Sequence, residues 1–232
     1  MLADAEIGGR VRTTGLGDFI KELPALQFNH AIVYVPKQEG IDGATFVDAT
    51  PDTLDIDTLR QDSQNTWAMV IEPTSGDWEF VRIPLERAED QYTVRQTHIQ
   101  TNPGGQSKIE VVLTFKGPSG ASVRSILRNK DGARVFSSQL ANKLFPNSKA
   151  DSFTFSAEQD ITRPVVLKIG ILSDSVVREQ GDTLVIDIPK YHSFSKMIGL
   201  PERRLPLMGG LVQTLTETHE EVVVPKGYEP EH

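Results

Sequence analysis

Two polar residues, His30 and Asp48, stand inside two otherwise apolar runs of this sequence, Phe28–Pro36 and Ala44–Thr50. The runs are rich in Val, Ile, Phe and Tyr and are bounded by Pro and Gly, a pattern typical of two buried strands of a hairpin. A carboxylate beside an imidazole can accept its N–H, fix its tautomer and keep it basic, as the orienting acid does in a nucleophile–His–Asp triad. The pair therefore predicts base catalysis beside a nucleophile.

The register of the hairpin decides whether the two side chains can meet. If Pro36 pairs with Ala44, the even-numbered residues of both strands share one face. His30 and Asp48 are then diagonal neighbours at roughly 7–8 Å. A slip of one residue puts them on opposite faces. Two plainer interpretations stay open: a buried His that a backbone carbonyl satisfies, and an Asp at a strand end that caps a turn.

Several stretches of the chain resemble one protein family. FNHAIVYV (28–35) and TFVDATP (45–51) resemble the His and Asp strands of the transglutaminase-like superfamily, the papain-related cysteine enzymes. The most similar branch is bacterial, and in it a β-rich domain of unknown function follows the core. The opening stretch 1–7 is similar to the end of the helix that carries the family's nucleophilic Cys. The stretches 202–207 and 222–228 are similar to the close of the β-rich domain.

The resemblance implies a role for each member of the pair. His30 would be the catalytic base and Asp48 its orienting acid, in acyl transfer from a peptide amide by hydrolysis or transamidation. It also implies a periplasmic or extracellular location, because such bacterial proteins are commonly exported. We assign substrate contacts, with a protein or peptide, to Trp67 and Asn29. The apolar runs themselves favour a place in the core for both Trp67 and Trp78, and a substrate groove lined by the two indoles is the alternative.

The sequence departs from this family in one respect, because none of its 232 residues is Cys. We expect the family's Cys, and with it the oxyanion donor, to lie upstream of Met1, so that the sequence is the C-terminal part of a longer protein. The chain by itself is therefore expected to be inactive. The alternative function is a non-catalytic module that binds a protein or polysaccharide at the bacterial cell surface, with the core fragment as scaffold.

Composition limits the function classes. The chain has 24 basic and 32 acidic residues, a net charge of −8, which argues against a nucleic-acid surface. No run approaches the 18 apolar residues of a membrane span. The lack of Cys removes disulfides and thiolate metal sites. His192 and His219 have no partners at metal-ligand spacing, so we expect no metal and no cofactor.

The first domain is expected over residues 1–88, as the C-terminal half of an α+β transglutaminase-like core. Residues 1–7 are expected to end a helix at Gly8-Gly9, and Arg10–Thr14 to form a short strand. Trp67–Glu72 is expected to flank the His–Asp hairpin in the same antiparallel sheet. A turn at 75–77 then leads into a further strand.

The second domain is expected over residues 89–232, after a charged and solvated boundary that includes Glu86. Alternating patterns predict a hairpin of Tyr92–Gln100 and Lys108–Phe115. Helical spacing predicts two helices near 119–146, with Asp131 able to cap the second. The remaining expected strands indicate an all-β, sandwich-like arrangement around this helical insertion; they are Ser152–Ser156, Val165–Leu172, Thr183–Ile188, Leu211–Thr218 and Glu220–Val224.

A core that keeps only the tail of its Cys helix has an uncovered face. We expect the face of Phe28–Val35 and Trp67–Ile71 to lose its cover. Four exposed large apolar side chains forfeit roughly 1.5–3 kcal/mol each, which is comparable to the stability of a whole domain. The sequence therefore predicts that a second copy of the chain, or the β-rich domain folded back, covers this face.

Overall fold

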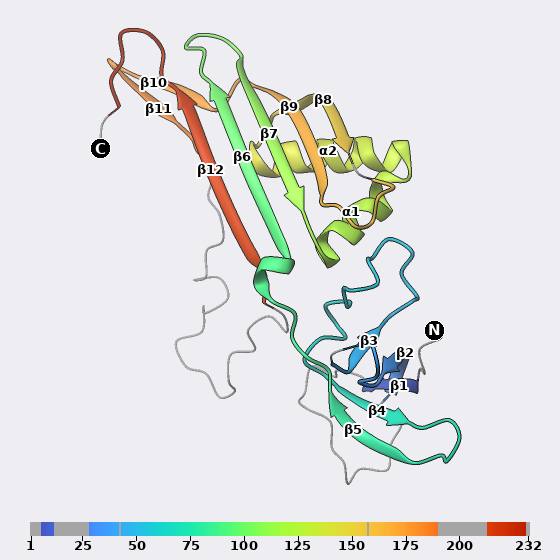
Figure 1. Ribbon diagram of the computed structural model, residues 1–232. Helices are drawn as coiled ribbons and strands as arrows, with labels where there is room; N and C mark the ends of the chain where they lie inside the picture. Colours follow the sequence, from blue (N-terminus) through green and yellow to red (C-terminus); the bar gives the residue numbers. More distant parts are fainter. Residues whose placement is uncertain (1–5, 12–27, 42, 157, 190–212, 231–232) are drawn as a thin grey trace, which may run out of the picture.

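The computed structural model describes residues 6–11, 28–41, 43–156, 158–189 and 213–230 (Figure 1). For residues 6–11 and for Asn29 the backbone alone is described. The chain forms a mixed fold, with two α-helices and strands in three sheets. The predicted mixture of helices and strands is thereby confirmed.

The N-terminal sheet is antiparallel, with the strand order β3-β2-β1-β4-β5. Its strands are β1 (Glu6–Val11), β2 (Phe28–Val35), β3 (Thr45–Val47), β4 (Trp67–Ile71) and β5 (Trp78–Arg82). In the β2–β3 hairpin Val33 lies opposite Val47 and Val35 opposite Thr45. In this register the even-numbered residues of both strands share one face, so the predicted register is confirmed.

The start of the chain differs from the prediction of a helix end. Glu6–Val11 is a strand with Gly8 and Gly9 in its interior, and it pairs with β2 on one side and β4 on the other. Neighbouring strands satisfy the backbone of β1 along both edges, which a short helix end closing in two glycines cannot match. As a result, β4 lies in the same sheet as the His–Asp hairpin but not next to it. The predicted helix residues 1–5 lie outside the described residues.

One face of this sheet carries a hydrophobic core, which a nearby segment of the same chain covers. Ile32, Ala68 and Val70 are buried there, and Leu59 from the connection between β3 and β4 packs against them. The expected loss of cover is wrong for these side chains, because they are buried within the chain itself. On the opposite face, Val33 and Met69 are half-buried.

The junction between the two halves of the chain holds a buried polar network. β5 ends at Arg82, a 3-10 turn spans Ala88–Asp90, and the next strand begins at Tyr92. The side chains of Gln64 and Gln91, both almost fully buried, exchange two hydrogen bonds of 3.0 Å each.

Glu86 belongs to the same network. It accepts hydrogen bonds from the amide of Leu59 and from Nε2 of Gln64, the latter at 3.0 Å. Burial raises the pKa of Glu86 and outweighs these hydrogen bonds, and the nearby charge of Asp90 raises it further. The expectation that Glu86 lies in a solvated boundary is therefore wrong. The predicted division at residue 88 falls in the connection between the two sheets.

The C-terminal sheet has five strands in the order β12-β6-β7-β9-β8. They are β6 (Tyr92–Gln100), β7 (Ser107–Phe115), β8 (Lys149–Ser156), β9 (Val165–Ser173) and β12 (Leu215–Val223), and a separate hairpin joins β10 (Val177–Gln180) to β11 (Thr183–Ile186). The β6–β7 hairpin is confirmed. β12 runs parallel to β6 as one continuous edge strand, where two strands broken at His219 were expected.

Two helices, α1 (Pro118–Leu127) and α2 (Lys130–Leu144), cover one face of this sheet (Figure 1). Ala141 and Leu127 are buried against the apolar side of β7 and β9. Asn129, not Asp131, caps α2, because its side chain accepts from the amides of Asp131 and Gly132 at 2.9 and 3.5 Å.

The other face of the sheet is polar and carries exposed residues from β6, β7 and β9; they include Gln96, His98, Lys108, Glu110 and Lys168. In the described part of the chain this sheet therefore packs on helices, and the second facing sheet of a sandwich is not confirmed. No described helix has the length and apolar character needed to cross a membrane.

Candidate active site

His30 and Asp48 meet on the core face of the N-terminal sheet. His30 lies in β2, and Asp48 directly follows the last residue of β3. The even-numbered residues Ile32 and Phe46 of the same face are buried beside them. Nε2 of His30 lies 2.9 Å from Oδ2 of Asp48. The predicted hydrogen bond between the two side chains is confirmed, while the catalytic roles stay predictions.

The two oxygens of Asp48 have different partners. Oδ2 meets the imidazole, whereas Oδ1 accepts the backbone N–H of Thr50 at 3.1 Å and also its hydroxyl. Asp48 therefore caps the turn after β3, as the plainer interpretation expected, and contacts His30 at the same time. The Thr50 hydroxyl lies 3.2 Å from Nε2 of His30. Thr50 thus connects the turn directly to the pair.

Electrostatics favour an ionised Asp48. Its side chain is 1% exposed and that of His30 is 15% exposed. Burial by itself raises the pKa of Asp48, but hydrogen bonds from the Thr50 hydroxyl, the His30 ring and the Thr50 amide act against it. Together with the charge of a protonated His30, they hold the pKa below its ordinary value of 3.8. The carboxylate is therefore charged at neutral pH.

An ionised Asp48 assigns the tautomer of His30. Because the carboxylate can only accept, Nε2 carries the hydrogen and Nδ1 of the neutral ring has a free lone pair. Among the described residues no group hydrogen-bonds to Nδ1. The arrangement can therefore accept a proton at Nδ1 and hold the resulting imidazolium against Asp48.

The turn that follows Asp48 is fixed to α1. Arg124, 3% exposed, donates to the carbonyl of Thr53 at 3.4 Å, to that of Asp160 at 2.9 Å and to that of Arg163. Arg128 forms an exposed ion pair of 2.7 Å with Asp52. The segment that presents Asp48 is thus held by the helical layer of the C-terminal half.

The predicted substrate contacts do not join the pair. Paired residues share a face in an antiparallel sheet, and the register through β1 places Ala68, not Trp67, on the face of His30. Trp67 lies on the opposite face, where Arg82 lies over its ring at 5.3 Å. This placement does not support substrate contact of Trp67 beside His30. Asn29 lies in β2, and its side chain is outside the described residues.

The other sequence predictions have mixed outcomes. Trp78 is 63% exposed, so its expected place in the core is wrong. His98 and His219 are exposed and pair with Glu221 and Glu217 at 3.1 and 2.7 Å. Within the described ranges no group of His, Asp and Glu could hold a metal ion. His192 lies outside those ranges.

Two residues around the pair were missed by sequence reasoning. The Asp-Ala-Thr spacing 48–50 is itself a signal for a turn in which an Asp side chain accepts the amide two residues on, and it could have identified Thr50. Arg124 gave no such signal, because a charged residue in an amphipathic helix is expected on the solvated side.

Comparison of the chain with known proteins identifies no relative. No protein-family model, curated protein or solved structure matches the chain.

Proposed function

We propose that the chain supplies the base and orienting acid of a thiol acyl-transfer site that acts on peptide amides, of the transglutaminase-like kind. The observation that carries this proposal is the 2.9 Å contact between Nε2 of His30 and the buried carboxylate of Asp48. Because Asp48 contacts Nε2, Nδ1 is the basic atom of the His30 side chain, which is 15% exposed. A buried carboxylate that orients an imidazole is the defining pair of such sites.

Each residue has a distinct part in the proposed reaction. Nδ1 of His30 takes the proton of a thiol, and the thiolate attacks the amide carbonyl. The imidazolium, stabilised by Asp48, then gives that proton to the leaving amine, and a thioester remains. Water or a second amine attacks the thioester carbonyl, releasing the acid or the new amide and restoring the thiol. Asp48 keeps its charge throughout.

The thiol has to come from outside these residues, because the sequence contains no Cys. The chain therefore supplies only the base and the orienting acid of the proposed site, and alone it has no nucleophile for the first step. Protein or peptide amides are the proposed substrates, and the periplasm or cell exterior is the proposed location. Self-association and the role of Trp67 and Asn29 in substrate binding also stay proposals.

The test measures hydroxamate formation from a Gln-containing peptide and hydroxylamine. The chain is assayed alone and joined to the polypeptide that its gene encodes upstream of Met1. We expect no turnover from the chain alone and turnover from the joined protein. His30→Ala lowers the rate by about 10²–10⁴-fold, the usual contribution of a general base. Asp48→Ala lowers it less, and the exposed His98→Ala variant serves as the unaffected control.

Three results would overturn the proposal. One is turnover by the chain alone that His30→Ala abolishes, since the nucleophile would then be a residue of this sequence. Another is a joined protein whose rate is the same with His30→Ala as without it. The third is a native translation start at Met1 with no upstream Cys, which leaves the pair without a thiol.

A binding module is the second candidate function, and one exposed aromatic residue favours it. Trp78 is 63% exposed, and its ring meets that of Phe80 edge-on with centroids 5.4 Å apart. Exposed indoles supply the flat apolar contacts that sugars and peptides use. A binding screen with cell-wall glycans and peptides tests this function. Binding that Trp78→Ala removes and His30→Ala leaves unchanged would favour the module over the enzyme.

A further inference from the structure

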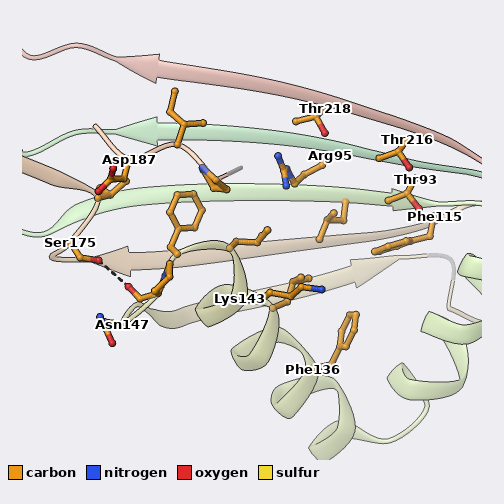
Figure 2. Close-up of a pocket in the computed structure, with 18 of the residues that line it drawn as sticks. Thr93, Arg95, Phe115, Phe136, Lys143, Asn147, Ser175, Asp187, Thr216 and Thr218 are labelled. Atoms are coloured by element: carbon orange, nitrogen blue, oxygen red, sulfur yellow. Dashed lines mark hydrogen bonds between the residues drawn. The ribbon is translucent and has the colours of Figure 1, made fainter. Parts of the chain in front are cut away.

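A cavity of about 940 Å³ lies between α2 and the C-terminal sheet, away from the His30–Asp48 pair (Figure 2). Its sheet wall comes from β6, β7 and β12, and its helix wall from the second half of α2. One end lies beside the β10–β11 hairpin, near Ser175 and Asp187. This volume is within the range of small-molecule sites.

The lining of the cavity is mainly apolar. The apolar lining residues include Leu113, Phe115, Phe136, Leu140, Leu144 and Val176. Among them, Phe136, Leu140 and Leu144 recur at intervals of four on one side of α2, so they form a continuous apolar wall about 12 Å long at 1.5 Å per residue. Such a wall suits a linear aliphatic chain that lies along the helix.

Two cations stand on opposite walls of this apolar space. Arg95 from β6 is 4% exposed, and Lys143 comes from α2 (Figure 2). Arg95 donates to Glu220 of the neighbouring strand. Arg178 and Asp187, the other charged lining residues, pair with each other at 3.0 Å.

These pairs leave the cavity with an excess of positive charge. The charge of Glu220 offsets that of Arg95, and the charge of Asp187 offsets that of Arg178. Lys143 forms no ion pair with any described residue, so its charge is the one that stays uncompensated. An anionic group near Lys143 and Arg95 would complement it.

We propose that this cavity binds a free aliphatic carboxylate, a fatty acid of medium chain length. The aliphatic chain of the fatty acid lies along Phe136, Leu140 and Leu144. Its carboxylate contacts the side chains of Lys143 and Arg95. The apolar wall accounts for the chain and the single uncompensated cation for one negative charge. This site is separate from the proposed acyl-transfer pair and does not depend on it.

Calorimetric titration with dodecanoate, below its micelle concentration, tests the proposal on the full chain. We expect saturable binding of one molecule, and binding of decanoate roughly fifteenfold weaker, because each of the two missing methylenes contributes about fourfold in affinity. The cation dodecyltrimethylammonium should not bind. Lys143→Met should lower the affinity for dodecanoate by about fivefold or more. Lys149 is an exposed lysine on β8 outside the cavity, and Lys149→Met should leave the affinity unchanged.

A blocking variant locates the site. Thr216 lines the cavity from β12, and the next residue, Glu217, faces the other side of the sheet. Thr216→Trp should abolish dodecanoate binding, while Glu217→Trp retains it, and circular dichroism shows that both fold. The proposal fails if dodecanoate does not bind, if the ammonium binds equally well, or if Thr216→Trp binds as the wild type does.

Discussion

Gln64 and Gln91 exchange both hydrogen bonds of their side-chain amides, each 3.0 Å long, at the junction between the two sheets. Gln64 precedes β4 of the N-terminal sheet, and Gln91 precedes β6 of the C-terminal sheet. Both amides are almost fully buried, and Gln64 also bonds to Leu59 and Glu86. The two halves of the chain are therefore coupled through a polar contact.

Replacing Gln91 with Leu should destabilise the protein by about 1–3 kcal/mol, since it leaves the buried amide of Gln64 without one donor and one acceptor. Urea unfolding at neutral pH measures the change in free energy. Gln96→Leu, an exposed position on β6, is the matched control and should change stability by less than about 0.5 kcal/mol. Equal stability of Gln91→Leu and wild type would show that the amide pair is not a structural contact.

Asp48 should stabilise the folded state above acidic pH. Its folded-state pKa is below 3.8, so the unfolded chain binds more protons as the pH falls. This contribution is present above the unfolded pKa and is lost as the pH falls through the folded pKa. The stability of wild type relative to Asp48→Asn should therefore rise from about pH 2 to about pH 5 and then level off. Denaturant unfolding over this range measures it, and a constant difference would contradict the assignment.

Glu86 should have the opposite pH dependence. Its folded-state pKa is raised, so its contribution is fully present below the unfolded pKa and is lost as the pH rises through the folded pKa. We expect wild type to lose stability relative to Glu86→Gln as the pH rises from about 4 to 7. Thermal unfolding of both proteins across this range tests the sign. If wild type instead gained stability relative to Glu86→Gln as the pH rises, folding would stabilise the ionised carboxylate of Glu86.

Arg124 should matter far more than Arg128, although both extend from the end of α1 toward the turn after Asp48. Arg124→Met removes the buried donor to three carbonyls, and we expect a loss of at least about 2 kcal/mol. Arg128→Met removes an exposed ion pair and should cost less than about 1 kcal/mol. Urea unfolding compares the two variants.

A second measurement follows the effect of Arg124 on the pair. The ¹⁵N spectrum of His30 should show hydrogen on Nε2 in wild type and in Arg128→Met. In Arg124→Met we expect a mixture of tautomers, because the turn that presents Asp48 is released. An unchanged spectrum together with the stability loss would mean that Arg124 supports the fold without positioning Asp48.

Local pattern was sufficient for the hairpin that carries His30 and Asp48. Apolar runs with β-branched and aromatic residues, a short polar loop and period-two alternation specify both the strands and their register. The same local rules placed β6, β7 and the two helices within a few residues. Their signals lie within each segment, so they could be read without knowing its neighbours.

The remaining features depend on partners far away in the sequence. β1 has a glycine pair and no alternation, and it is a strand because β2 and β4 hydrogen-bond to it on both sides. Likewise, β12 runs parallel to β6 by a long-range pairing that no local spacing encodes. The sequence predicts that Arg124 and Glu86 are solvated charges, yet in the structure both form polar contacts between elements. By itself the sequence determined where an imidazole and a carboxylate share a strand face. Only the tertiary structure decided which groups surround them, because the burial of a polar group depends on partners that folding brings together.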